Sequence, residues 1–196
     1  IIRKLTQGIL LKIVLSVSKG LMTKMTQESN ISNLLEIKDL KMHFPVRGGI
    51  FGRKIGSVHA VDGVSFKIAE GSTLGLVGES GCGKSTLGKS IVRLYKPTSG
   101  KVIFDNKNIT NMGQGSLRPY RKDFQMVFQD PAESLDARMS VAQLISEPMV
   151  IQKIGDRGSR RERVYELLDR VGLPKSSADK FSFEFSGGQR QRIGIA

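Results

Sequence analysis

The sequence has little of several residue types that define particular classes of protein. Cys82 is its one cysteine, so an internal disulfide framework is excluded, and its place in a glycine-rich loop is typical of a reducing, cytosolic setting. His43 and His59 are its two histidines, and neither stands at zinc-ligand spacing from a cysteine pair. Tryptophan is absent and aromatic residues make up 6%, too few to suggest a stacking platform for nucleic-acid bases.

Acidic residues are also scarce, with 18 Asp and Glu against 31 Lys and Arg and a formal net charge of +13. Such an excess raises the question of nucleic acid or an anionic membrane surface as a partner. The lysines and arginines are, however, spread along the whole chain rather than gathered in one block. This distribution favours a solvated basic surface together with an anionic ligand site, and we expect no nucleic-acid partner.

No apolar run is long enough to span a membrane. The N-terminal stretch is apolar and basic, but Lys12 interrupts it, and it lacks the small-residue cleavage site of a secretory signal. Met22 and Met25 lie just ahead of the first strand-like segment. We therefore expect residues 1–29 to form an extension outside the fold, with an amphipathic surface helix as the alternative.

Alternating apolar residues predict β-strands in the first part of the chain. One runs from Leu34 to Phe44 with a one-residue slip that indicates a bulge, and a second covers 64–68. The apolar run 73–77 predicts a strand buried on both faces, as in a parallel sheet. A hairpin turn is predicted at 105–107, and a further strand at 124–128. These elements predict a mixed α/β core.

Helical periodicity replaces the alternation further along the chain. A helix is expected over 87–94, with Leu87, Ile91 and Leu94 on one face. Ser140 is placed to cap a second helix. A third is expected to open with a capping box of Ser159 and Glu162 and to stop at Gly172.

The segment GESGCGKST matches the phosphate-binding pattern GxxxxGK[ST]. Its glycines allow backbone N–H groups to approach phosphate oxygens, and the following helix adds the positive end of its dipole. Lys84 is expected to bridge the β- and γ-phosphates, Ser85 to ligate Mg²⁺, and Thr86 to reach another phosphate. An accidental glycine turn is the alternative, and the flanking strand and helix argue against it. The expected ATP-binding residues are Gly78, Glu79, Ser80, Gly81, Cys82, Gly83, Lys84, Ser85 and Thr86.

A second motif, FSGGQRQR, narrows the class of nucleotide-binding protein. Ser186 and Gln189 form a capping box that could open an ordinary helix, but Gly187 and Gly188 each disfavour a helix by about 0.8–1 kcal/mol. That cost is reasonable where the backbone must approach a ligand. The motif resembles the LSGGQ signature of ABC ATPases, with phenylalanine in place of leucine. The resemblance implies that the signature residues contact the ATP held by a second subunit; they are Phe185, Ser186, Gly187, Gly188 and Gln189.

Two further roles follow from this resemblance. Gln129 stands where the family carries its Q-loop glutamine, which would act in catalysis by contacting Mg²⁺ and the attacking water. Phe44 stands where the family places an aromatic residue that stacks on adenine. Packing in the core is an equal alternative for Phe44, since it continues an apolar alternation. His59 is a weaker candidate for the stacking role.

The segments HFPVRGG, HAVDGVSF and MVFQDPAESLDARMSV, taken with the two motifs, resemble the ATP-binding subunits of peptide/nickel-type importers. The resemblance implies an α/β fold with a P-loop NTPase (RecA-like) core and an antiparallel β subdomain at 30–130, and the start of an α-helical subdomain at 131–196. It also implies an ATPase at the cytoplasmic face of the membrane that uses ATP and Mg²⁺ to energise oligopeptide or dipeptide uptake. Its partners would be a second ATPase subunit, identical or different, the transmembrane permease subunits and, indirectly, an extracytoplasmic peptide-binding protein.

The sequence departs from the family in three places. Phe183 stands where relatives often carry histidine, and the loop after Gln129 shows small differences. The Walker B aspartate, catalytic glutamate and switch histidine, which follow the signature helix in the family, are not in the sequence. The domain is therefore expected to be incomplete and inactive by itself. Two other functions stay open, a soluble ABC-type ATPase of DNA repair or translation and a basic RNA-binding module.

Overall fold

The computed structural model describes residues 33–48, 53–128 and 135–196. The chain forms two compact units, which divide between Met126 and Val127. The expected extension at 1–29 and Gln129 lie outside the described residues.

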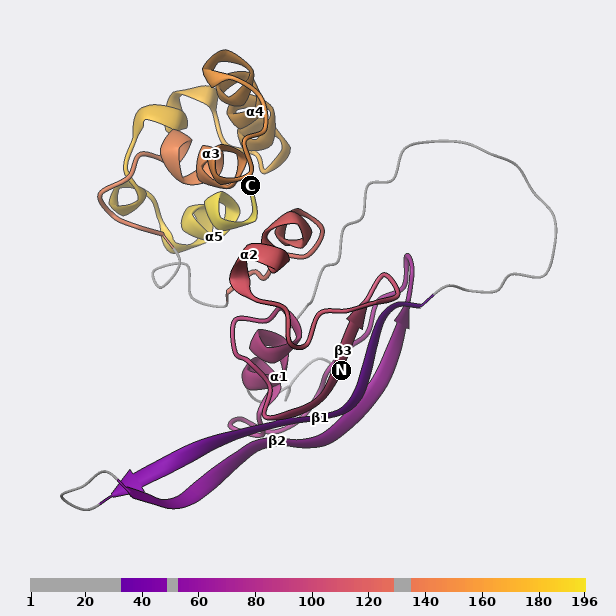
Figure 1. Cartoon of the computed structure of the whole chain (residues 1–196). Helices are drawn as coiled ribbons and strands as arrows, with labels where there is room; N and C mark the ends of the chain where they lie inside the picture. The colour runs from indigo at the N-terminus through magenta and orange to yellow at the C-terminus, as the bar shows by residue number, and fades with distance from the viewer. Residues whose placement is uncertain (1–32, 49–52, 129–134) are drawn as a thin grey trace, which may run out of the picture. The chain divides into compact units, whose positions relative to one another are not determined.

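The first unit is built on an antiparallel sheet with the strand order β2-β1-β3-β4. The strands are β1 (Asn33–Gly48), β2 (Arg53–Ala69), β3 (Ser99–Phe104) and β4 (Lys107–Asn108). Along β1, strand β3 covers only the first half, up to Lys41. Beyond this point β1 and β2 continue together as a two-stranded ribbon (Figure 1).

The predicted bulge in the first strand is confirmed. The pairing of β1 with β2 shifts register between Ile37 and Leu40, and Asp39 at this point has φ 43°. The shift keeps Leu35, Ile37 and Leu40 on the buried face although their spacing changes.

The core of this unit lies between the sheet and helix α1 (Lys84–Ile91). Leu87 and Ile91 are buried against the sheet as expected. The helix ends earlier than predicted, because the chain turns at Arg93 with φ 58°, and Leu94 is consequently 49% exposed. The predicted hairpin at 105–107 is confirmed, since Asp105 and Asn106 both adopt positive φ between β3 and β4.

Two predicted strands are absent from the described part of the chain. The run 73–77 does not form a β-strand of the sheet, and its Val77 is 83% exposed. A parallel strand forms only where a neighbouring strand completes its hydrogen bonds, and the sheet of the described residues is antiparallel throughout. The run 124–128 is irregular as well, although Phe124 is buried and packs edge-to-face against Phe104. A short helix α2 (Gln114–Leu117) and a 3-10 turn η1 (Arg118–Lys122) precede it.

The second unit is helical and has its own hydrophobic cluster. Its elements are α3 (Val141–Ile151), α4 (Arg157–Arg170), η3 (Lys175–Asp179), η4 (Ser182–Glu184) and α5 (Gly187–Ile195). Ser140 caps α3 as predicted, in a capping box with Gln143. The cap of α4 is Asp156 rather than Ser159, because the helix starts one turn earlier than predicted and Ser159 becomes the reciprocal partner. Gly172, with φ 69°, follows the end of α4 as expected.

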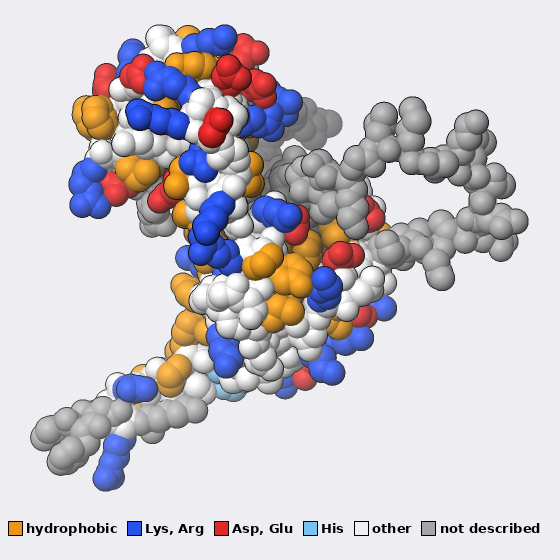
Figure 2. All heavy atoms as spheres, turned by 45° about the horizontal axis from the view of Figure 1, so that its top comes forward, with side chains coloured by type: hydrophobic (Ala, Val, Ile, Leu, Met, Phe, Trp, Pro, Cys, Tyr) orange, Lys and Arg blue, Asp and Glu red, His pale blue; other side chains and the backbone are white. Residues whose placement is uncertain are grey.

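None of the described helices is long and apolar enough to cross a membrane. Lys and Arg side chains are distributed over the face shown in Figure 2, with Asp and Glu among them, rather than gathered in one block.

Candidate functional site: the glycine loop and its surroundings

The glycine loop before α1 is shaped by backbone conformations that side chains rarely adopt. Gly81 and Gly83 have φ 83° and 91°, and Gly83 is the N-cap of the helix. A Cβ built on Gly83 would lie 2.0 Å from the carbonyl oxygen of Ala60 in β2. Only glycine allows this approach, which holds the loop directly against the sheet.

Lys84, the first residue of α1, is 5% exposed and directs its ammonium group back into the loop. Nζ donates hydrogen bonds of 2.8 Å to the Gly78 carbonyl and 2.5 Å to the Glu79 carbonyl. It also lies 3.3 Å from the sulfur of Cys82. The loop thus wraps around a single positive charge that is largely removed from solvent.

A cavity of about 330 Å³ opens beside this loop. Gly81, Cys82, Gly83, Lys84, Ser85 and Thr86 line one side, and Val58, His59 and Ala60 of β2 line the other. It joins the N-terminus of a helix, a buried ammonium and two hydroxyl side chains in one concave site, which is the chemistry that binds phosphate groups. Glu79 and Ser80 are exposed and are not among the lining residues.

Phe44 is half-buried outside the core cluster of the sheet. Its ring meets the ring of Tyr95 edge-on, with centroids 5.6 Å apart and planes at 89°. Phe44 is not among the residues that line the cavity, whereas His59, the weaker candidate for adenine stacking, is.

The signature motif begins α5 in the second unit. Ser186 caps the helix: its hydroxyl accepts from the Gln189 N–H, and the Gln189 side chain accepts from the Ser186 N–H at 3.0 Å. A Cβ on Gly187 or Gly188 would meet nothing within 4 Å, so packing inside the unit does not require these glycines. Phe185, by contrast, is buried in the helical cluster.

Two neighbouring arginines fix the end of α1. Arg93 is buried and donates to the carbonyl oxygens of Ile109, Tyr95 and Met112. Arg121 donates to the carbonyls of Val92 and Arg93, the two residues that follow the helix. Burial lowers the pKa of both guanidinium groups, and the charge of Arg121 lowers the pKa of Arg93 further. They hold the turn that follows α1.

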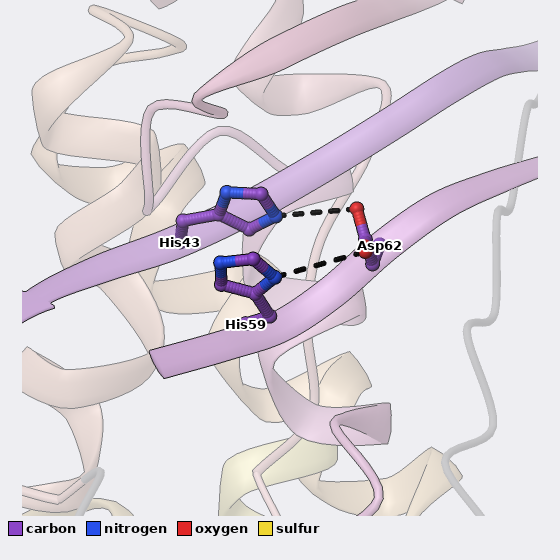
Figure 3. A group of neighbouring side chains, drawn as sticks. All are labelled: His43, His59 and Asp62. Atoms are coloured by element: carbon purple, nitrogen blue, oxygen red, sulfur yellow. Dashed lines mark hydrogen bonds and ion pairs between the residues drawn. The ribbon is translucent and has the colours of Figure 1, made fainter. Parts of the chain in front are cut away.

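The two histidines of the chain, which showed no metal-ligand spacing in the sequence, lie together in the structure. His43 and His59 stack with ring centroids 3.8 Å apart, and both face the Asp62 carboxylate (Figure 3). Motif spacing could not have found this group. The signal that could have found it is the hairpin register, which pairs His43 with His59 across β1 and β2.

A glycine loop that leads into a helix and encloses a buried lysine beside a cavity defines a P-loop nucleotide-binding domain. The family model described as ABC transporter matches residues 61–196. The chain therefore belongs to the ABC transporter family.

Similar proteins of known role agree with this family. The oligopeptide transport ATP-binding protein AppF of Bacillus subtilis is 52% identical over 169 residues, which are 86% of this chain and 51% of AppF. The glutathione import ATP-binding protein GsiA of Salmonella typhimurium is 46% identical over 163 residues, or 83% of this chain and 26% of GsiA. The chain spans about half the length of AppF and of the OppF proteins that it matches.

Solved structures give the same fold. The ATP-binding cassette MJ0796, in a dimeric post-hydrolysis state bound to ADP and Pi, superposes with a TM-score of 0.69 at 27% identity. The match covers 82% of this chain and 67% of that one. The fold is thus the expected α/β P-loop domain with an antiparallel β subdomain and part of a helical subdomain.

Proposed function

We propose that this chain is the nucleotide-binding part of an ATP-hydrolysing subunit that energises oligopeptide or dipeptide uptake. The supporting observation is Lys84, a buried residue that lines a cavity together with the glycine loop and the start of α1. A fixed positive charge with helix N–H groups around it stabilises the β- and γ-phosphates of a nucleotide.

Each loop residue has a separate task in this proposal. Lys84 binds the β- and γ-phosphates, and the backbone of Gly81, Cys82 and Gly83, which line the cavity, holds the remaining oxygens. The Ser85 hydroxyl is exposed on the cavity wall beside Lys84, which suits a ligand of Mg²⁺. Bound Mg²⁺ would neutralise the phosphate charge during transfer to water. Gln129 would contact the same metal and the attacking water.

The signature residues act on the ATP of another subunit in this proposal. Gly187 and Gly188 leave the first turn of α5 open, with no internal neighbour that needs the space. A ligand phosphate can therefore approach the helix N-terminus closely. The dimeric state of MJ0796 supports an equivalent dimer here.

The likeness to AppF and OppF supports a peptide substrate, and the likeness to GsiA supports glutathione as a second candidate substrate. The subunit would act at the cytoplasmic face of the membrane, against transmembrane permease subunits, with the substrate delivered by an extracytoplasmic binding protein.

Binding of Mg-ATP to the purified chain tests the proposal directly. We expect Lys84→Ala to abolish binding, measured by calorimetry or with a fluorescent ATP analogue, because the described residues that line the cavity include no other lysine or arginine. Lys101→Ala, which removes an equal charge from an exposed position of β3, should bind ATP as the parent does. Equal binding by the Lys84 variant would refute the P-loop assignment.

The same titrations separate the proposal from an RNA-binding module. An RNA partner would bind with an affinity that falls steeply as salt rises and does not respond to ATP. We expect ATP binding that is competed by ADP and no tight binding of single-stranded RNA at physiological salt.

A further inference from the structure

We propose that His43, His59 and Asp62 form a binding site for a divalent transition-metal ion such as Zn²⁺. The site lies on the β1/β2 ribbon. His59 also lines the cavity beside the glycine loop, but none of the three ligands is the one proposed for Mg²⁺, Ser85. One nitrogen from each histidine and a carboxylate oxygen of Asp62 lie within 4.8 Å of one another. In Figure 3 the two rings stand face to face and both point at the Asp62 carboxylate.

The backbone brings these three residues together by a specific irregularity. His43 pairs with His59, while the preceding pair is Met42 with Val61, so Ala60 is an extra residue on β2. In a regular strand, residues three apart such as His59 and Asp62 point to opposite faces. The extra residue at the bulge reverses that alternation and places both side chains on one face.

Two interactions behind the site orient its ligands. Ser57 Oγ lies 3.1 Å from His59 Nε2, so the other ring nitrogen, Nδ1, is the one that faces Asp62 at 3.7 Å. His43 presents Nε2 at 3.3 Å from the same carboxylate, and its backbone N–H donates to Thr98 Oγ at 2.9 Å. A hydrogen bond to the second ring nitrogen, as Ser57 makes to His59, orients a metal-binding imidazole, whereas the bond to Thr98 holds the backbone of His43.

The ligand set selects the class of metal. Imidazole nitrogens suit Zn²⁺, Co²⁺, Ni²⁺ and Cu²⁺, whereas Mg²⁺ prefers oxygen ligands. Two histidines and one carboxylate with an outer position open to water form a four-coordinate zinc site. The stacked rings lie 5° from parallel, so they must tilt until both lone pairs meet the ion. The side chains are 21%, 53% and 55% exposed for His43, His59 and Asp62, which leaves room for that rotation.

Lys41 competes with a metal ion for the Asp62 carboxylate. Its ammonium lies 3.9 Å from Asp62 Oδ1 and 4.0 Å from Asp39 Oδ1. A cation at that distance weakens the attraction of Asp62 for a second cation. Removing the charge should therefore strengthen metal binding here, whereas Zn²⁺ bound far from Asp62 would be unaffected.

Zn²⁺ titration of the full 196-residue chain, followed by calorimetry and by the imidazole resonances of the NMR spectrum, tests the proposal. The chain has two histidines, so the ring signals of these two side chains report the site. We expect binding of one Zn²⁺ per chain, with both signals shifting together, and no shift with Mg²⁺. Co²⁺ should give the visible absorption of a four-coordinate site.

Variants decide which residues hold the ion. His59→Gln and Asp62→Asn should each weaken Zn²⁺ binding at least about ten-fold, and Lys41→Met should strengthen it about two- to five-fold. The side chains of Lys41, His59 and Asp62 are 35%, 53% and 55% exposed, and circular dichroism will show whether each variant retains the fold. Cys82→Ser removes the exposed thiol of the nearby cavity. This variant should bind Zn²⁺ with the affinity of the parent. Absence of one-to-one Zn²⁺ binding, or binding that depends on Cys82 but not on His59, would overturn the proposal.

Discussion

The carbonyl oxygen of Ala60 occupies the space in which Gly83 would otherwise carry a side chain, 2.0 Å from the ideal Cβ position. Ala60 is the extra residue of the β2 bulge, and Gly83 is the last residue before α1. The bulge and the phosphate loop therefore meet through their backbones, and the shape of one fixes the position of the other.

Gly83→Ala should disrupt this contact. A side chain at φ 91° is strained, and its methyl group would overlap the Ala60 carbonyl, so we expect a loss of at least about 2 kcal/mol in the free energy of unfolding. Urea denaturation followed by circular dichroism measures this loss. Gly75→Ala is the matched control, because a Cβ there meets nothing within 4 Å, and its stability should change by less than about 0.5 kcal/mol. Equal stability of the two variants would contradict the packing argument.

Phe44→Ala tests the adenine-stacking role. Because stacking on an aromatic ring is worth ~1–3 kcal/mol per base, we expect ATP affinity to fall about ten-fold or more. Binding of inorganic triphosphate, which has no base, should stay unchanged, and Phe44→Trp should retain ATP binding. A lower melting temperature with unchanged ATP affinity would instead assign Phe44 to packing against Tyr95.

Phe185 should behave as a core residue of the helical unit. Phe185→Leu, which introduces the residue usual at this place in the family signature, should cost less than about 1.5 kcal/mol, because the volume change is small. Phe185→Ala should cost about 3–5 kcal/mol by leaving a cavity in the helical cluster. Thermal unfolding of the three proteins provides the comparison, and a mild effect of the alanine variant would show that Phe185 does not support this core.

Asp156 should make the stability of α4 depend on pH. The backbone N–H and hydroxyl of Ser159 lower the pKa of the Asp156 carboxyl. The stabilisation is therefore present above the unfolded pKa of about 3.9 and is lost as the pH falls through the lower folded value. Asp156→Asn keeps a capping oxygen but cannot titrate, so it should lose less stability than the parent between neutral and acid pH. Thermal unfolding of the two proteins across this range measures the difference.

Local patterns in the sequence predicted the first strand with its bulge, the Asp105-Asn106 turn, the Ser140 cap and the stop at Gly172. Each of these depends on residues next to one another in the chain. The parallel strand at 73–77 failed because its form depends on neighbouring strands rather than on its own apolar residues. The glycine loop was evident from one contiguous motif, whereas the group of His43, His59 and Asp62 depends on the register of a hairpin, which no spacing rule contains.

The helices α3, α4 and α5 each begin with a reciprocal capping box, formed by side chains three residues apart. The sheet of the first unit instead pairs Leu35 with Phe104, residues that are distant along the chain. Local contacts form quickly and distant ones must first close a long loop. We therefore expect the helical unit to fold early. The pairing of β3 with β1 should be the slowest step of folding.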